Sequence, residues 1–171
     1  MQKLIAVVLL LLLATTAAAE TRDVNQFFFN QKFGDFKAEL DNARREGKIG
    51  ILLMYEQAEC PFCRRMETTV LNQSEVQDYY RKHFLIFSVD IRGDTPMTDF
   101  KGKETTEKVF SAENRARATP VFAFYDLRGD QVARFTGVAK DAGEFLLLGK
   151  YVVDGEYRQM PFARYKMQSG R

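Results

Sequence analysis

The stretch "ECPFCRRM", residues 59–66, carries two cysteines three positions apart, and the chain has no others. This spacing occurs in redox pairs, in metal sites and among inert core residues, so its surroundings must decide. The preceding run "IGILLMY", 49–55, is short and continuously apolar, which is typical of a strand buried on both faces. Pro61 suits the first turn of a helix, where a missing N–H costs nothing. We therefore expect a strand, a short loop and a helix that begins at the cysteines.

A helix start gives Cys60 its expected chemistry. Free backbone N–H groups and the helix dipole favour an anion there. We therefore expect the thiol pKa to fall below its free value of about 8.5, and the thiolate is the nucleophile. Cys63 is within bridging reach one turn later, and its sulfur should lie deeper because the helix turns it toward the sheet. Arg64 and Arg65 favour the thiolate, whereas Glu59 opposes it, so the sign of their sum stays open.

The first nineteen residues predict export. Lys3 is followed by an apolar run and then by Ala17-Ala18-Ala19, the small-residue pattern at which signal peptidase cleaves. The apolar run is shorter than the ~20 residues that span a membrane. We expect a signal peptide over 1–19, cleavage near Ala19, a single domain over 20–171 and a periplasmic location. The net charge of +2, without a clustered basic run, predicts no nucleic-acid partner.

Export also changes the interpretation of the cysteines. In an oxidising compartment, a structural disulfide stabilises most when it closes a long loop, but this one encloses two residues. A zinc site needs four ligands, or three and water, and the chain offers one further candidate, His83. We expect no metal and no cofactor, with a copper carrier as the alternative. A redox pair is the favoured interpretation.

The remaining pattern alternates helices and strands. Phe36, Leu40 and Ala43 share one face of an expected helix within 34–48, and Gly47 suits its C-terminal cap. Ser74, with Gln77 three residues on, suggests a capping box. Further expected elements are strands at 84–91, 120–126 and 131–137, a helix of about a dozen residues ending near Arg117, and a helix over 142–153. Strands separated by helices imply parallel neighbours, and the last hairpin implies an antiparallel edge.

Two separated motifs, "CPFC" and "ATPVFAFYDLRGDQVARFTG" (118–137), resemble the thioredoxin superfamily over about residues 34–153. The resemblance implies a thioredoxin-like α/β fold, in which helices flank a central mixed parallel and antiparallel sheet. It also implies a cis peptide bond before Pro120, because cis bonds are essentially a proline phenomenon. Thr119 and Pro120 would then lie beside the cysteines and form a substrate groove with Pro61 and Phe62.

More narrowly, "LLMYEQAECPFCRRM", "FSVDIRGD" and "FKGKETTEKVF" are similar to the SoxW-like branch of exported bacterial thioredoxins. That resemblance implies periplasmic thiol reduction, in service of sulfur-oxidation or cytochrome-maturation proteins. The chain departs from the cytosolic pattern at Met54, where many thioredoxins carry a buried acid. Glu56 is the nearest candidate for proton transfer to or from Cys63, and a solvated carboxylate at a strand end is the alternative.

The direction of electron flow follows from the same resemblance. Strongly oxidising relatives often carry a histidine inside the motif, where this chain has Phe62, and the threonine before Pro120 resembles reductive relatives. We expect a reductase of disulfide-containing exported proteins, supplied with electrons by a membrane protein of the DsbD or CcdA type. The alternatives are a thiol oxidase, and a non-catalytic module that binds copper or a partner.

Overall fold

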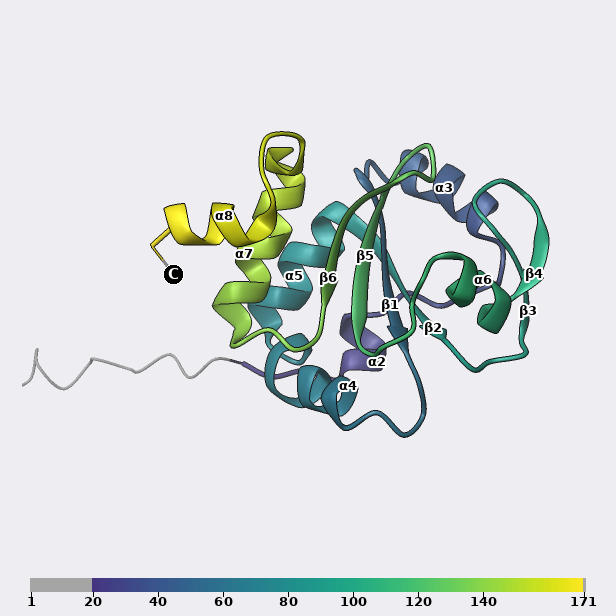
Figure 1. The fold of residues 1–171 in the computed structure, drawn as a ribbon, viewed down its shortest axis with the longest axis horizontal. Helices are drawn as coiled ribbons and strands as arrows, with labels where there is room; N and C mark the ends of the chain where they lie inside the picture. The colour runs from purple at the N-terminus through teal and green to yellow at the C-terminus, as the bar shows by residue number, and fades with distance from the viewer. Residues whose placement is uncertain (1–19, 171) are drawn as a thin grey trace, which may run out of the picture.

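The computed structural model describes residues 20–170, and the predicted signal peptide lies outside them. Among these residues, four strands form one sheet in the order β2-β1-β5-β6 (Figure 1). The strands are β1 (Gly50–Glu56), β2 (Phe84–Asp90), β5 (Val121–Asp126) and β6 (Gln131–Thr136). β1 pairs with β2 in parallel and with β5 antiparallel, and β6 continues antiparallel to β5. β1 and β5 are therefore the two inner strands of the sheet.

Helices cover both faces of this sheet, and Figure 1 shows α5 and α7 on one side with α3 and α6 on the other. The helices are α3 (Phe36–Arg45), α4 (Pro61–Met66), α5 (Ser74–His83), α6 (Glu107–Glu113) and α7 (Ala142–Val153). In the described chain, the buried residues form an apolar cluster on each face. Alternate residues of β1 feed the two clusters: Leu52 and Met54 face α4, α5 and α7, and Leu53 and Tyr55 face α3 and α6. The predicted fold class is confirmed.

The direction of β5 corrects the prediction that strands separated by helices are parallel neighbours. Tyr55 lies opposite Val89 of β2 and also opposite Val121 of β5. β2 therefore ends, and β5 begins, at the same edge of the sheet. The connection over residues 91–120, which contains α6, therefore returns to the edge that it left and does not cross the sheet.

The segment between β2 and β5 also differs from the prediction of a helix of about a dozen residues ending near Arg117. Two short strands, β3 (Pro96–Thr98) and β4 (Glu104–Thr106), pair antiparallel in this segment, where the sequence predicted no strand. α6 ends at Glu113, because Arg115 adopts a left-handed φ of 56° that cannot continue a helix. The rest of the segment is a loop that leads to Thr119.

The capping box predicted at Ser74 is wrong. Ser74 is the first residue of α5, and its backbone N–H donates to the carbonyl of Glu20. The Gln77 side chain instead donates to the carbonyls of Leu71 and Arg22. A π-helical turn over Glu67–Leu71, which no sequence pattern predicted, links α4 to this region.

Further elements lie at the two ends of the described chain. They are α2 (Val24–Phe27), a 3₁₀ turn (Glu156–Arg158) and α8 (Phe162–Gln168). α8 lies against α7, where the rings of Tyr151 and Phe162 are 5.4 Å apart. Within residues 20–170, no helix combines the length and apolarity needed to cross a bilayer.

Candidate active site

The two cysteines lie at the start of α4, just after the loop that connects β1 to this helix. β1 ends at Glu56, three loop residues follow, and Cys60 is the N-cap of α4 with an extended backbone. Its Sγ accepts a hydrogen bond of 3.0 Å from the backbone N–H of Cys63. Pro61 occupies the first helical position, as the sequence predicted. The helix start thus directs a free N–H group at the sulfur of Cys60.

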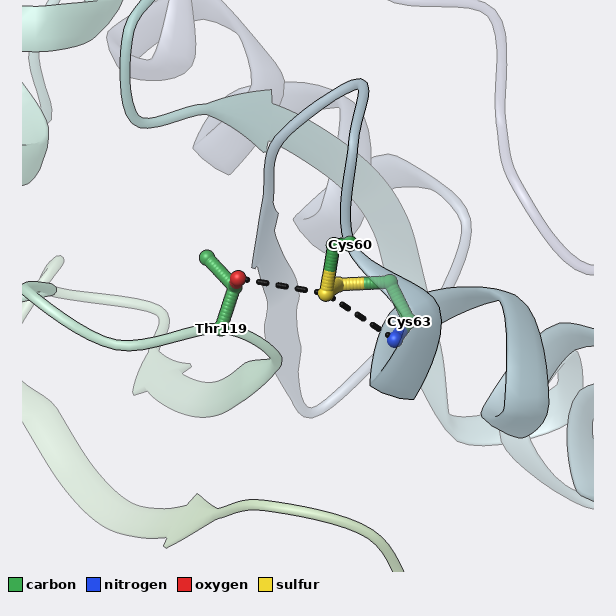
Figure 2. Close-up of a disulfide and its surroundings, with 3 residues drawn as sticks. All are labelled: Cys60, Cys63 and Thr119. Atoms are coloured by element: carbon green, nitrogen blue, oxygen red, sulfur yellow. Dashed lines mark hydrogen bonds between the residues drawn. A yellow bond between two sulfur atoms is a disulfide. The ribbon is translucent and has the colours of Figure 1, made fainter.

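Cys60 and Cys63 form a disulfide across the first turn of α4, with their Cα atoms 5.2 Å apart (Figure 2). Both are buried: 7% of Cys60 and 3% of Cys63 is exposed. Both belong to the apolar cluster that α4, α5 and α7 share. Cys63 is the less exposed of the two, so Cys60 is the sulfur that an incoming partner reaches more easily.

Thr119 approaches the disulfide from a distant part of the sequence. Its Oγ1 donates a 3.1 Å hydrogen bond to Cys60 Sγ, and Figure 2 shows this hydroxyl directed at the sulfur. The peptide bond between Thr119 and Pro120 is cis, and Pro120 is buried. β5 begins at the next residue, Val121, which pairs with Tyr55 near the end of β1. Sheet register therefore brings Thr119 to Cys60.

Pro61 and Phe62 lie between the two cysteines and point into solvent. Both are exposed, Phe62 to 59%, although the two cysteines beside them are buried. An exposed ring here offers an apolar contact to anything that approaches Cys60. The two residues that the resemblance assigns to a groove are thus accessible.

A pocket of about 550 Å³ opens beside the disulfide. It is lined by Glu56, Gln57, Ala58, Cys60, Cys63, Arg64, Glu67, Thr68 and Asp90. Glu56, expected from the sequence as the nearest candidate for proton transfer, thus faces the same space as Cys63. Met54, at the position where many thioredoxins carry an acid, is fully buried in the apolar cluster.

Two carboxyl groups that line this pocket, those of Glu56 and Glu67, have raised pKa values. Burial raises the pKa of Glu56, and the neighbouring carboxylate of Glu67 raises it further, while a hydrogen bond with Ser88 acts in the opposite direction. Burial also raises the pKa of Glu67, against the opposing effects of Arg64 and of a hydrogen bond with Glu56. The two acids therefore interact, and both hold protons to a higher pH than exposed glutamates do.

Sequence reasoning missed Glu67, although a signal was present. Glu67 lies four residues after Cys63, and residues at this spacing lie on the same face of a helix. The opposite side of the pocket comes from the ends of β1 and β2, through Glu56 and Asp90.

Within the part of the chain that the structure describes, no group of three His, Cys, Asp or Glu side chains is arranged to hold a metal ion.

Comparisons with known proteins agree on the fold. The model of the thioredoxin-like domain family matches residues 36–152. A thioredoxin from Thermus thermophilus superposes with a TM-score of 0.53 at 25% identity, over 70% of this chain and 84% of that one. A thioredoxin-fold protein from Helicobacter pylori gives a TM-score of 0.59 at 19% identity, over 72% and 86%. The oxidised C-terminal domain of Neisseria meningitidis DsbD gives 0.51 at 18%, over 72% and 97%. The search of curated protein sequences returned no match.

The contact between Thr119 and Cys60 can be tested in the reduced protein. Hydrogen bonds to charged groups contribute about 1.5–3 kcal/mol, and one pKa unit corresponds to 1.36 kcal/mol. We therefore expect Thr119→Val to move the ultraviolet thiolate titration to higher pH by about one unit. Thr119→Ser keeps the hydroxyl and should titrate within about 0.3 units of the wild type. Coincident titrations for the valine variant and the wild type would show that the hydroxyl does not stabilise the thiolate.

Proposed function

Because the chain belongs to the thioredoxin-like domain family, it is a thiol–disulfide oxidoreductase, and we propose that it reduces disulfides in exported proteins. The observation that carries the proposal is the Cys60–Cys63 disulfide, whose more exposed sulfur receives hydrogen bonds from a helix N-terminus and from Thr119. Both donors favour a sulfur that carries negative charge. Cys60 is therefore the nucleophile and Cys63 the resolving thiol.

The reaction proceeds by two exchanges of sulfur–sulfur bonds. In the reduced enzyme, the Cys60 thiolate attacks one sulfur of the substrate disulfide, and the other substrate sulfur leaves as a thiolate and takes up a proton. Cys63 then loses its proton and attacks Cys60 Sγ, which breaks the mixed disulfide and releases the second substrate thiol. Two electrons and two protons pass to the substrate, and the enzyme is left with the Cys60–Cys63 disulfide.

Glu56 is the residue that we assign to the proton of Cys63. It lines the pocket that also exposes Cys63, and it is partly buried, so a proton can pass between them directly or through one water. The neighbouring carboxylate of Glu67 raises the pKa of Glu56, so Glu56 binds that proton more tightly. Glu59, which precedes Cys60 directly, is exposed and does not line this pocket.

The substrate groove in this proposal consists of Pro61, Phe62, Thr119 and Pro120. Backbone groups before Pro120 pair with an extended substrate segment as an added strand, and the exposed ring of Phe62 contacts an apolar side chain of that segment. No cofactor is required, because both electrons come from the thiols. The groove thus presents a substrate disulfide to Cys60.

We assign the direction as reduction in the periplasm. The pocket beside the cysteines is lined by three carboxyls, those of Glu56, Glu67 and Asp90, and by one cation, Arg64. The excess of acids disfavours a thiolate and so makes the dithiol a stronger reductant. Cleavage of the predicted signal peptide near Ala19 delivers the protein to an oxidising compartment. A membrane protein of the DsbD or CcdA type then regenerates the dithiol. The substrates, as in the SoxW-like branch, are proteins of sulfur oxidation or cytochrome maturation.

The order of attack can be tested by trapping. Cys63→Ala removes the resolving thiol, so we expect covalent complexes with exported proteins to accumulate on Cys60 and to disappear on addition of dithiothreitol. Cys60→Ser should abolish disulfide exchange with insulin, a loss of more than about 1000-fold, because the attacking sulfur is gone. Complexes trapped by Cys60→Ala in place of Cys63→Ala would reverse the two roles.

The role of Glu56 predicts a specific pH dependence. The pKa of Glu56 is raised, so its carboxylate, the form that accepts a proton, is lost at a higher pH than in an exposed glutamate. Resolution of the mixed disulfide should therefore slow as the pH falls through that raised pKa. Glu56→Gln should be slower by about 100-fold above it and should lose this dependence. Glu59→Gln, the matched control at an exposed site, should keep the wild-type profile. A Glu56→Gln profile that matches the wild type would exclude the assignment.

A redox titration of residues 20–171 against glutathione tests the direction. Thioredoxin has a potential of about −270 mV and the oxidant DsbA about −120 mV, a gap of roughly 7 kcal/mol at about 30 mV per 1.4 kcal/mol. Because the pocket disfavours a thiolate and Phe62 cannot donate to one, we expect a value within about 40 mV of thioredoxin. A value near that of DsbA would identify an oxidase.

A further inference from the structure

A second groove, of about 440 Å³, lies next to the redox site. It is lined by Gln57, Ile91, Arg92, Lys108, Ala112, Ala116, Arg117, Ala118 and Thr119. Gln57 also lines the acidic pocket, so the two hollows adjoin. Thr119, which contacts Cys60, forms part of the wall. A substrate segment that leaves the disulfide past Thr119 therefore enters this groove.

The groove is basic. Among the described residues that line it, three carry positive charge and none carries negative charge. Arg92 follows β2, Lys108 belongs to α6, and Arg117 precedes Thr119 in the loop before β5. All three side chains are exposed. Segments from three places in the sequence thus bring their cations to one hollow, which is why no basic run in the sequence marked it.

These cations are not neutralised within the protein. Over residues 20–170, the hydrogen bonds of Arg92, Lys108 and Arg117 are made by their backbone groups, and no ion pair engages their side chains. Glu107 is the sequence neighbour of Lys108, but its carboxylate is buried and paired with Lys32. The positive charge of the groove is therefore available to a ligand.

We propose that this groove binds an acidic segment that adjoins the disulfide of the protein substrate. The inference rests on the proposed function and adds a substrate class to it. Charge complementarity supports it, because the cations have no internal partner, and the small side chains of Ala112, Ala116 and Ala118 leave room for a peptide backbone between them. The acidic pocket on the other side of Gln57 repels the same segment, so the two hollows together favour one orientation of the substrate.

We expect the basic groove to change mainly the rate at which the substrate associates with the enzyme. Exposed charges are screened by salt over about 10 Å at 0.1 M, and single surface ion pairs contribute little to affinity. A set of like charges around a groove nevertheless raises the rate of encounter with an oppositely charged partner by about 10-fold or more. The groove should therefore change the second-order rate of exchange, and salt should reduce its effect.

Three cyclic peptides of one sequence, each closed by a single disulfide and flanked by Glu, Gln or Lys residues, provide the test. The enzyme is reduced with dithiothreitol, desalted and mixed with each peptide, and the loss of enzyme thiols in a single turnover gives the rate constant. We expect the Glu peptide to react about 10-fold faster than the Gln peptide at low salt, and the ratio to approach one at about 0.5 M salt. The Lys peptide should be the slowest.

Variants assign the preference to the groove. The triple variant Arg92→Gln, Lys108→Gln and Arg117→Gln should reduce the Glu-to-Gln ratio to within about twofold. The matched control, Lys82→Gln, Lys150→Gln and Arg164→Gln, removes the same charge from exposed positions on α5, α7 and α8 and should keep the ratio. Because each ratio compares two peptides on one protein, it is independent of overall activity.

The outcomes separate this inference from the proposed function. Equal rates for the Glu and Gln peptides in the wild type would overturn the acidic-segment proposal while leaving reduction intact. A control variant that loses the preference as fully as the groove variant would attribute it to net charge and would also overturn the proposal. Failure of the reduced wild type to react with any peptide would contradict the proposed function itself.

Discussion

The structure depends on the position of β1, which is hydrogen-bonded on both edges and buried on both faces. Its side chains alternate between the two apolar clusters, so neither a shift nor a rotation of the strand is tolerated without exposing apolar surface. Gly50 begins the strand because a Cβ there would lie 2.1 Å from the carbonyl oxygen of Tyr125. With β1 fixed, its carboxyl end is fixed as well, and the three loop residues that follow place Cys60 at the start of α4.

The same pairing assembles the rest of the site at one edge of the sheet. The register places Val89 and Val121 on either side of Tyr55. Asp90, which follows Val89, therefore reaches the pocket, and Thr119, two residues before Val121, reaches Cys60. The disulfide, its hydrogen-bond donor Thr119 and the acids come from separate segments, yet they share this one constraint.

Much of this arrangement could be predicted because it is local. The continuous apolar run of β1 predicts burial on both faces, Pro61 marks the helix start, and the helix over 142–153 was predicted with its observed bounds. Gly47 has a positive φ of 67° just after α3, as expected of a glycine at a helix end. Each of these features depends on neighbouring residues whose side chains report burial or backbone conformation directly. The position of Thr119 and Pro120 beside the cysteines came instead from the resemblance to the thioredoxin superfamily.

What could not be predicted is set by contacts between distant segments. The direction of β5 depends on where β2 ends. The pairing of β3 with β4 occurs in a segment whose polar composition does not indicate strands. Gln77 has the spacing of a capping residue, but its side-chain amide donates instead to the backbone carbonyls of Leu71 and Arg22. The partnership of Glu56 with Glu67 requires the end of a strand to meet a helix, and no pattern along the chain indicates it.

The charged groups in the two hollows beside the disulfide differ in burial, and this difference suits them to different roles. Glu56 and Glu67 are partly buried, so their protons are held more tightly and their state depends on pH; such groups suit proton transfer. Arg92, Lys108 and Arg117 are exposed and stay charged, and salt screens them; such groups suit recognition. Because Gln57 borders both hollows, a substrate that reacts as we propose at Cys60 would meet the acids on one side and the cations on the other. In the proposed mechanism, proton transfer and substrate recognition therefore depend on different residues, so a substitution can alter one without altering the other.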